Sequence, residues 1–318
     1  MVTFTAVVAA YNAEPWIGEA LEAILGQTRP PEEVVVVDDG STDGTARVLE
    51  GFGDAIRVVR RRNGGCPAAF NTAFREARGD FVAMCGADDI WEPRKLEWQA
   101  ETLAAHPEVD VLFGDARVIG EHRPAGLTSE RLDNDLYTEG VPAGVLDGGM
   151  LRDRLYRGNF ICAPSIAIRR SLFERLGPFI EDYGADDYEY WMRCLRAGAK
   201  FFYDPRPLLS YRRHESNLSS KLLWMAQCSH DVHRRYADFI EDRSLAREIL
   251  AEDLFRIARC LVDEDRAREA STAFRASLRH RLDPRALVWV AILALPPALR
   301  EHTGSRFVDL SRALAQQS

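Results

Sequence analysis

The chain has 318 residues, of which 46% are hydrophobic and 28% charged, and its formal net charge at pH 7 is −8. This composition is typical of a globular protein with one large domain and an accessory one, and the acidic balance disfavours nucleic acid as a partner. The six cysteines are widely spaced and form no Cys-x-x-Cys pair. We therefore expect reduced thiols in a cytoplasmic protein and no zinc site.

Short apolar runs alternate with helical patterns along the first 115 residues. Strands are predicted at residues 4–9, 34–37, 56–59, 81–89 and 109–113, and helices at about 15–28, 43–49, 67–77 and 93–106. This alternation predicts a doubly wound α/β sheet. No Gly-x-Gly-x-x-Gly and no Gly-x-x-x-x-Gly-Lys motif occurs, so the binding of a nucleotide would have to depend on acidic residues instead.

The alternation weakens after residue 115. Residues 120–150 are rich in Gly, Pro, Asp and Glu, which predicts a lid or a substrate-binding segment. The next predicted elements are strands at 165–168, 201–203 and 208–211, and helices at about 169–176 and 186–197. From residue 222 the sequence has few glycines and shows helical spacing at 223–236, 246–262 and 267–278. We expect an α/β domain at 1–218 followed by an α-helical region at 219–318.

Two adjacent acidic residues, Asp88 and Asp89, follow the apolar run that begins at Phe81. Ligands of open α/β folds bind at the carboxyl ends of the strands. Two neighbouring carboxylates repel each other and can share a hard divalent cation that also bridges phosphates. The alternative is that Asp89 caps a helix starting near Pro93.

Seven short motifs are spaced along residues 1–215. They are VVAAYN at 7–12, VVVVDDGSTDGT at 34–45, NGG at 63–65, AAFN at 68–71, ADD at 87–89, GADDYEYWMR at 184–193 and YRRH at 211–214. Together, and in this order, they resemble the family-2 inverting glycosyltransferases of the GT-A fold. The resemblance implies a GT-A-type doubly wound mixed sheet, in which residues 1–115 bind a nucleotide sugar and residues 116–218 bind the acceptor.

The donor that the resemblance implies is a nucleoside diphosphate sugar, and we expect a UDP-sugar. Asp39 would accept a hydrogen bond from the ring N–H of uracil, and Tyr11 would flank the base. Asp88 would bind the ribose hydroxyls or the metal, and Ala9 and Asn71 complete the implied nucleotide site. For Asp39 the alternative is turn and capping chemistry, and for Tyr11 it is core packing.

The resemblance also implies a metal-dependent reaction with a carboxylate base. Asp89 would hold Mn²⁺ or Mg²⁺, which offsets the charge that grows on the leaving diphosphate, and His214 would lie near the metal. The alternative for His214 is a surface residue, or one whose hydrogen bonds are satisfied within the protein. Asp187 would take the proton from the acceptor hydroxyl. It is preferred to its neighbour Asp186 because it stands six residues before Arg193.

Some positions depart from the family pattern. Many relatives carry Asp where this chain has Gly86, and many carry Arg where it has Phe70, so fewer acids surround the cation and a cationic contact to the nucleotide is missing. No Gln-x-x-Arg-Trp motif occurs, which argues against a processive polysaccharide synthase. The acceptor is expected to be a hydroxyl of a glycan or of a lipid-linked saccharide.

Two other functions are compatible with an acidic α/β site. A sugar-phosphate nucleotidyltransferase also uses carboxylates and Mg²⁺, but it would need a first loop rich in Gly, Arg and Lys, whereas residues 9–12 are AAYN. The other is a scaffold built around the helical tail that binds nucleotide sugars without catalysis, which the presence of Asp39, Asp88, Asp89 and Asp187 argues against.

An arginine-rich stretch precedes an apolar run near the end of the chain. The basic residues are Arg275, Arg279, His280, Arg281 and Arg285, and the run spans residues 286–295. One hypothesis is a peripheral contact with an anionic membrane surface at its inner face, which would suit a lipid-linked acceptor. The alternative is that the run packs against the helical tail or forms a contact between subunits of a homo-oligomer.

Overall fold

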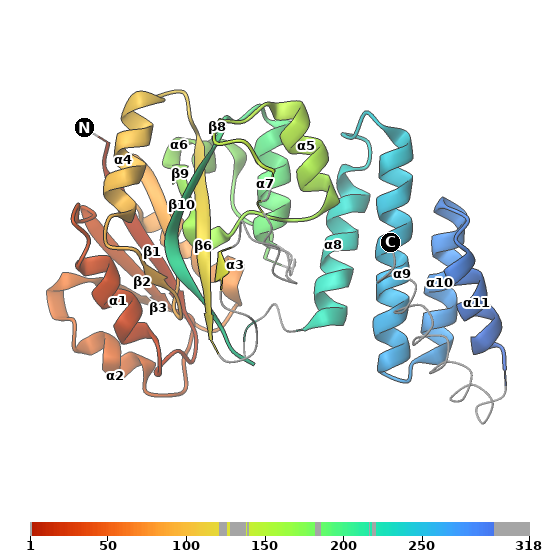
Figure 1. Cartoon of the computed structure of the whole chain (residues 1–318). Coiled ribbons are helices and arrows are strands. Elements are labelled where there is room, and N and C mark those ends of the chain that lie inside the picture. The colour runs from red at the N-terminus through yellow and green to blue at the C-terminus, as the bar shows by residue number, and fades with distance from the viewer. Residues whose placement is uncertain are drawn as a thin grey trace. The chain divides into compact units, whose positions relative to one another are not determined.

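The computed structural model of the chain describes residues 2–120, 126–127, 138, 140–181, 186–215, 217 and 221–295. These residues divide into two compact units, Met1–Leu218 and Ser219–Ser318. The first unit contains a mixed sheet flanked by helices, and the described part of the second is helical (Figure 1).

Four parallel strands form the amino-terminal half of the sheet. They are β1 (Phe4–Ala10), β2 (Glu33–Asp38), β3 (Arg57–Arg60) and β4 (Phe81–Gly86). The order across the whole sheet is β3-β2-β1-β4-β9-β6-β10-β5. β9 (Ala167–Arg169) is antiparallel to both β4 and β6 (Val111–Gly120), so it joins the parallel half to the rest of the sheet.

The remaining strands build the second half of the sheet around β6. β10 (Phe201–Arg213) runs parallel to β6 along its whole length, and β5 (Ile90–Trp91) is antiparallel to β10. Two short strands, β7 (Gly126–Leu127) and β8 (Gly144–Val145), are antiparallel to β6 and β10 respectively. The sheet is therefore mixed, as the sequence predicts.

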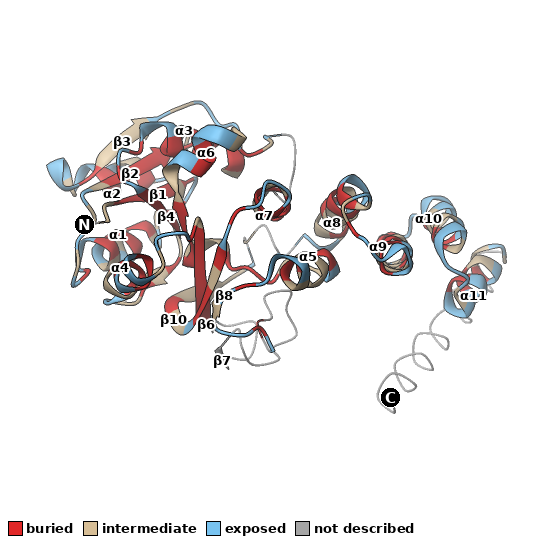
Figure 2. Cartoon of the chain, turned by 90° about the horizontal axis from the view of Figure 1, so that it is seen from above, coloured by how far each residue is buried: buried red, intermediate tan, exposed pale blue. Residues whose placement is uncertain are grey.

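Helices cover both faces of the parallel half because its strands are apolar on both faces. α1 (Ile17–Leu25) and α4 (Lys95–Ala105) pack on the face that contains Phe4, Ala6 and Val8. α3 (Cys66–Glu76) and α6 (Arg170–Leu176) lie on the opposite face (Figure 2), and the rings of their Phe74 and Phe173 are 4.7 Å apart. The short α2 (Thr45–Glu50) follows β2.

Three elements of the second half differ from the predicted ones. The two short strands expected at 201–203 and 208–211 form the single strand β10, whose register with β6 shifts between Asp204 and Leu209. Prolines 205 and 207 lie there and lack the N–H that a regular ladder needs. β6 continues seven residues beyond its predicted end at residue 113. α5 (Gly148–Arg157) was not predicted, because its Asp147 cap is followed by two glycines.

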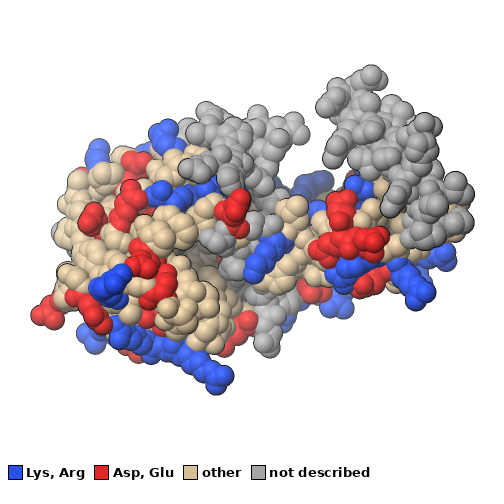
Figure 3. Space-filling model, turned by 90° about the horizontal axis from the view of Figure 1, so that it is seen from below, with Lys and Arg blue, Asp and Glu red and all other residues tan. Residues whose placement is uncertain are grey.

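The described part of the second unit consists of four consecutive helices. They are α8 (Leu222–Tyr236), α9 (Arg243–Asp263), α10 (Ala267–His280) and α11 (Pro284–Leu293). No described helix is both long and apolar enough to cross a membrane. On the face that Figure 3 shows, acidic and basic side chains lie interspersed.

The apolar run near the end of the chain forms α11 and packs inside this helical unit. Trp289 is 4% exposed and its ring stacks on Phe274, with centroids 5.8 Å apart. Arg281 and Arg285 form ion pairs with Glu248 and Glu252 of α9. Trp289 and these two arginines thus make the contacts that the packing alternative predicts, while Leu287 and Val288 of the same run remain exposed.

A lysine is wholly buried beneath the sheet in the first unit. Lys95 Nζ donates to Gln99 Oε1 at 3.2 Å and to the Ile166 carbonyl at 3.5 Å, and it lies 4.0 Å from the centre of the Trp91 ring. None of these three partners of Lys95 is a carboxylate. Burial lowers the pKa of Lys95 from 10.5 to about 7.

We expect this lysine to make the stability of the first unit depend on pH. Between pH 7 and 9 the unfolded chain keeps the proton and the native state releases it, so the free energy of unfolding should rise by about 2 kcal/mol as the pH increases. Lys95→Met should lack this increase. Urea denaturation of both proteins at several pH values measures the difference, and equal slopes for the two proteins would show that Lys95 keeps its proton when buried.

Candidate active site

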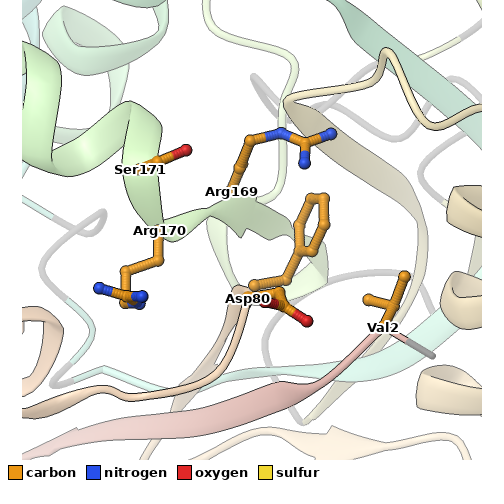
Figure 4. A pocket seen from close by; sticks show the side chains of 6 residues that line it. Val2, Asp80, Arg169, Arg170 and Ser171 are labelled. Atoms are coloured by element: carbon orange, nitrogen blue, oxygen red, sulfur yellow. The ribbon is translucent and has the colours of Figure 1, made fainter.

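The pocket shown in Figure 4 lies at the amino ends of β1 and β4, away from the predicted site. It is lined by Val2, Asp80, Phe81, Arg169, Arg170 and Ser171. Arg169 is held by the carbonyls of Pro107 and Val109 and by Asp110, and Asp80 accepts from Thr3. These polar groups are engaged by their neighbours, so we place the site at the other edge of the sheet.

The carboxyl ends of β1, β2 and β4 bring three predicted residues to one edge. Ala9 is in register with Val37 of β2 and with Gly86 of β4. Tyr11, Asp39 and Asp88 each lie two residues beyond this row, where open α/β sheets bind their ligands. Tyr11 is 52% exposed, so the core-packing alternative does not hold for its side chain.

Asp39 is buried but is held by donors from the loop that follows β3. Its carboxylate accepts from the backbone N–H groups of Gly64 and Gly65, and Arg61 Nε lies 3.2 Å from Oδ1. The Gly64 N–H lies 3.1 Å from both carboxylate oxygens, so these donors together make four contacts with Asp39. They fix the carboxylate at the carboxyl edge of the sheet.

Asn71 has a different role from the predicted one. It is wholly buried in α3, where its amide donates to the Phe179 carbonyl and to Glu181 and accepts from the Phe179 N–H. Both amide hydrogens and the amide oxygen are thus used to join α3 to a segment more than a hundred residues away. We do not assign Asn71 to nucleotide binding.

β5 brings the acidic pair to His214. Ile90 pairs with Ser210 of β10 in antiparallel register, so the residues before Ile90 continue beside the residues after Ser210. As a result, His214 Nε2 lies 2.9 Å from Asp88 Oδ2, and Asn217 Nδ2 donates to the same oxygen at 3.1 Å. His214 is therefore part of the acidic cluster and not a solvated surface residue.

Two further side chains fix this cluster and were not predicted. The Trp16 ring, at the start of α1, stacks on the His214 ring with centroids 4.1 Å apart. Arg212 donates through Nε to the Asp88 carbonyl at 2.9 Å, and its backbone N–H donates to Asp89 Oδ1 at 3.0 Å. Both contacts join segments that lie far apart in the sequence, so no local motif reveals them.

Asp89 is a buried carboxyl group with one oxygen that lacks a hydrogen-bond partner among the described residues. It is 1% exposed, and among the described residues its Oδ2 has no hydrogen-bond partner. Burial and the charge of Asp88 raise the pKa of Asp89 well above its ordinary value. It does not cap α4, which begins at Lys95 after an Arg94 cap. An oxygen in this position is suited to a cation.

The donor atoms of this cluster are of the kinds that divalent cations bind. Within the described residues, no three His, Cys, Asp or Glu side chains are placed so that they could hold a metal ion. His214 Nε2 and Asp88 Oδ2 lie 2.9 Å apart and are hydrogen-bonded to each other. With the free oxygen of Asp89, these atoms would supply one nitrogen and two oxygen ligands.

Gly86 provides the space that the two carboxylates occupy. A Cβ at this position would lie 2.5 Å from Asp89 Oδ2 and 2.7 Å from Asp88 Oδ1, closer than real Cβ atoms come. The glycine that departs from the family pattern is thus required by the way this chain arranges its two acids.

We expect Gly86→Ala to weaken cation binding by about 10–100-fold, because the methyl group displaces both carboxylates. Calorimetric titration with Mn²⁺ in the presence of UDP measures the loss. Gly148→Ala is the matched control, since a Cβ at Gly148 meets nothing within 4 Å. Equal Mn²⁺ affinity in the two variants would place the cation elsewhere.

Asp187 lies in the first turn of α7 (Asp186–Arg196) and is partly buried. Its Oδ1 accepts from the Tyr188 N–H at 2.7 Å and its Oδ2 accepts from Asn159 Nδ2 at 3.1 Å. Burial raises the pKa of Asp187 above its ordinary value, which makes it a better proton acceptor. The side chain of Asp186 lies outside the described residues.

The charges of Asp89 and Asp187 both act on the buried thiol of Cys162. Burial raises the pKa of this thiol well above its ordinary value, and the charges of the two carboxylates raise it further.

The model of the family described as "Glycosyl transferase family 2" matches residues 5–177, which is more than half of the chain. The chain belongs to this family. The family and the enzyme class that the sequence predicts are thereby confirmed.

Relatives of this family-2 glycosyltransferase are found in several bacteria. An uncharacterized glycosyltransferase of Rickettsia typhi is 27% identical over 218 residues, which cover 68% of this chain and 66% of that protein. One of Rickettsia felis is 31% identical over 220 residues, which cover 68% of this chain and 35% of that protein. An uncharacterized protein of Mycobacterium bovis is 31% identical over 215 residues, covering 64% and 57%. The chain thus spans two thirds or less of these relatives.

Solved glycosyltransferase structures share the fold of this chain. Staphylococcus aureus TarS 1–349 in complex with UDP-GlcNAc gives a TM-score of 0.66 at 19% identity, covering 98% of this chain and 92% of that one. The mannosyltransferase PcManGT of Pyrobaculum calidifontis, in complex with GDP-Man and Mn²⁺, gives 0.56 at 22% identity, covering 95% and 83%. These likenesses confirm the predicted GT-A-type mixed sheet followed by helices.

Proposed function

We propose that this family-2 glycosyltransferase moves a sugar, with inversion, from a UDP-sugar to a hydroxyl of a glycan or of a lipid-linked saccharide. The observation that carries the proposal is the cluster of Asp88, Asp89 and His214 at the carboxyl edge of the sheet, with a buried carboxylate oxygen that lacks a partner. The charges of Asp187 and Asp89 both raise the pKa of the Cys162 thiol.

The nucleotide would bind over the carboxyl ends of β1 and β2. Tyr11 is exposed there and offers a ring to flank the base, and Ala9 leaves the strand end open beneath it. Asp39, just beyond the carboxyl end of β2, would accept the ring N–H of uracil. TarS was solved with UDP-GlcNAc and PcManGT with GDP-Man, so nucleotide sugars are the ligands of both structural neighbours.

Asp89, Asp88 and His214 would hold Mn²⁺ or Mg²⁺ near the diphosphate. When bound, the cation offsets the negative charge that develops on the leaving diphosphate and orients it. Trp16 and Asn217 keep the His214 ring and the Asp88 carboxylate in place. The complex of PcManGT with Mn²⁺ supports the choice of metal.

Asp187 would act as the general base. Inversion in one step requires a carboxylate on the face of the sugar opposite the diphosphate, where it accepts the proton of the attacking hydroxyl. Its neighbours Asn159 and Tyr188 donate to the carboxylate, and each of its oxygens keeps an acceptor position for the substrate.

We further propose a division of labour along the chain. Residues 1–115 would bind the nucleotide sugar, residues 116–218 the acceptor, and the helical region at 219–318 a second subunit or the acceptor. The six cysteines form no disulfide in the structure, which supports a cytoplasmic setting.

Donor turnover by the full chain tests the proposed function. The protein is incubated with UDP-sugars, with GDP-mannose as comparison, in Mn²⁺ or in a chelator, and release of nucleoside diphosphate is measured with and without glycan acceptors. We expect release only with the cation, and an NMR spectrum of the product should show the inverted anomeric centre. Binding without turnover would support a scaffold, and exchange of pyrophosphate with a nucleoside triphosphate would support a nucleotidyltransferase.

A further inference from the structure

Asn159 lies in the connection between α5 and the short 3₁₀ helix at Ala163–Ser165, and its side chain contacts Asp187. Its Nδ2 donates to Asp187 Oδ2 at 3.1 Å, and its Oδ1 accepts from the Ile161 N–H at 3.2 Å. Because a backbone N–H can only donate, the oxygen of the amide must face Ile161. The nitrogen then has to face Asp187, so Asn159 acts as a donor to the carboxylate.

The second carboxylate oxygen of Asp187 is fixed from α7 itself. Oδ1 accepts from the Tyr188 N–H at 2.7 Å. Tyr188 is 1% exposed, and its hydroxyl donates to the Leu155 carbonyl of α5 at 2.6 Å. The end of α5 and the residues that follow it therefore hold the first turn of α7 at two points, and the carboxylate cannot rotate without losing one of two hydrogen bonds.

We propose that Asn159 is a positioning residue for the transfer reaction, which holds the Asp187 carboxylate in the orientation that receives the proton of the acceptor hydroxyl. The inference rests on the proposed function, in which Asp187 is the base. It assigns a task to the connection between α5 and β9, which no motif in the sequence marks.

Asn159 also acts on the ionisation of the base. Burial raises the pKa of Asp187, whereas the hydrogen bonds from Tyr188 and Asn159 lower it. A donor to a carboxylate favours its charged form, which is the form that takes a proton. Removal of Asn159 should therefore leave Asp187 protonated over a wider range of pH.

The other ionisable groups near Asp187 are the same in wild type and variant. Cys162 is the titratable neighbour on the adjoining turn, and its raised pKa keeps it neutral. Charged residues on the packed elements are Arg152, Asp153, Arg154 and Arg157 of α5, Arg170, Glu174 and Arg175 of α6, Asp186, Glu189, Arg193 and Arg196 of α7, and Asp89 and Arg213, whose charges act on Cys162. A difference between the two pH profiles therefore reports the loss of Asn159.

The experiment compares the pH dependence of kcat for wild type, Asn159→Ala and Asn159→Asp in the full chain with a UDP-sugar and Mn²⁺. In Asn159→Ala, kcat at pH 7 should fall about tenfold. The acid limb, which is the rise of kcat with pH on the acidic side of the profile, should shift to higher pH by about one unit, because a donor that stabilises the charged carboxylate is lost. In Asn159→Asp, the limb should move further, since two carboxylates face each other. The affinity for UDP should remain unchanged in both variants.

Gln27→Ala is the matched control, because Gln27 is a buried amide with bonds to the backbone of Ala23, Glu92 and Leu96 and none to Asp187. It should lower the melting temperature without moving the acid limb. If Asp187→Asn is inactive while folded Asn159→Ala keeps the wild-type pH profile, the role of Asn159 is wrong and the proposed function stands. If Asp187→Asn keeps normal turnover, Asp187 is not the base, and the role proposed for Asn159 is wrong with it.

Discussion

Replacement of Asp187 by asparagine is expected to lower turnover by about 10²–10⁴-fold, because the amide cannot accept the proton of the attacking hydroxyl. The affinity for UDP should barely change, since Asp187 contacts Asn159 and Tyr188 and is proposed to face the acceptor rather than the nucleotide. Single-turnover transfer and calorimetric titration with UDP measure the two quantities. The substitution is nearly isosteric, so the melting temperature should stay close to that of the wild type.

Asp186→Asn is the control, because the same chemical change is made one residue earlier on α7. Neighbouring positions on a helix differ by about 100° in direction, so only one of the two carboxylates can face the acceptor. An inactive Asp186→Asn beside an active Asp187→Asn would reverse the assignment.

Asp89→Ala should abolish transfer and remove the effect of Mn²⁺ on the affinity for UDP. The loss of a metal ligand withdraws several kcal/mol of stabilisation from the developing diphosphate charge. In the wild type without cation, Asp89 has a raised pKa in the folded state. Its stabilising contribution is therefore present at low pH and is lost as the pH rises above the ordinary value of 3.8.

Thermal unfolding with and without Mn²⁺ at pH 5 and pH 7.5 tests this second expectation. The cation should raise the melting temperature of the wild type more at pH 7.5, where Asp89 is more fully ionised, and should have no such effect on Asp89→Ala. Normal transfer by a folded Asp89→Ala protein would show that the cation is held elsewhere. A melting temperature independent of Mn²⁺ in the wild type would contradict the metal proposal itself.

The sequence was sufficient to predict the parallel half of the sheet and the polar residues that follow its carboxyl edge. β1, β2 and β4 are nearly continuous apolar runs, and each ends close to a polar residue that the prediction selected, namely Tyr11, Asp39 or Asp88. Runs of this kind can be recognised in the sequence because a strand that is buried on both faces must be apolar along its whole length. The helical tail was predicted from the helical spacing of its apolar residues.

The second half of the sheet was harder to predict from the sequence because its strands depend on partners far away in the chain. β5 has only two residues, and it is a strand because Ile90 and Trp91 meet β10 more than a hundred positions later. β10 continues through two prolines because β6 supports it on both sides of the irregular stretch. No local pattern encodes either pairing.

The sequence by itself determined which residue types are present at the site, and only the tertiary structure decided what each of them contacts. Asn71 belongs to a motif and yet serves to join α3 to Phe179. Trp16 and Asn159 belong to none of the seven motifs, and yet Trp16 stacks on His214 and Asn159 donates to Asp187. The physical reason is that a hydrogen bond or a ring contact requires atoms within a few ångströms, and that proximity is created by the pairing of strands and the packing of helices, which link positions far apart in the chain.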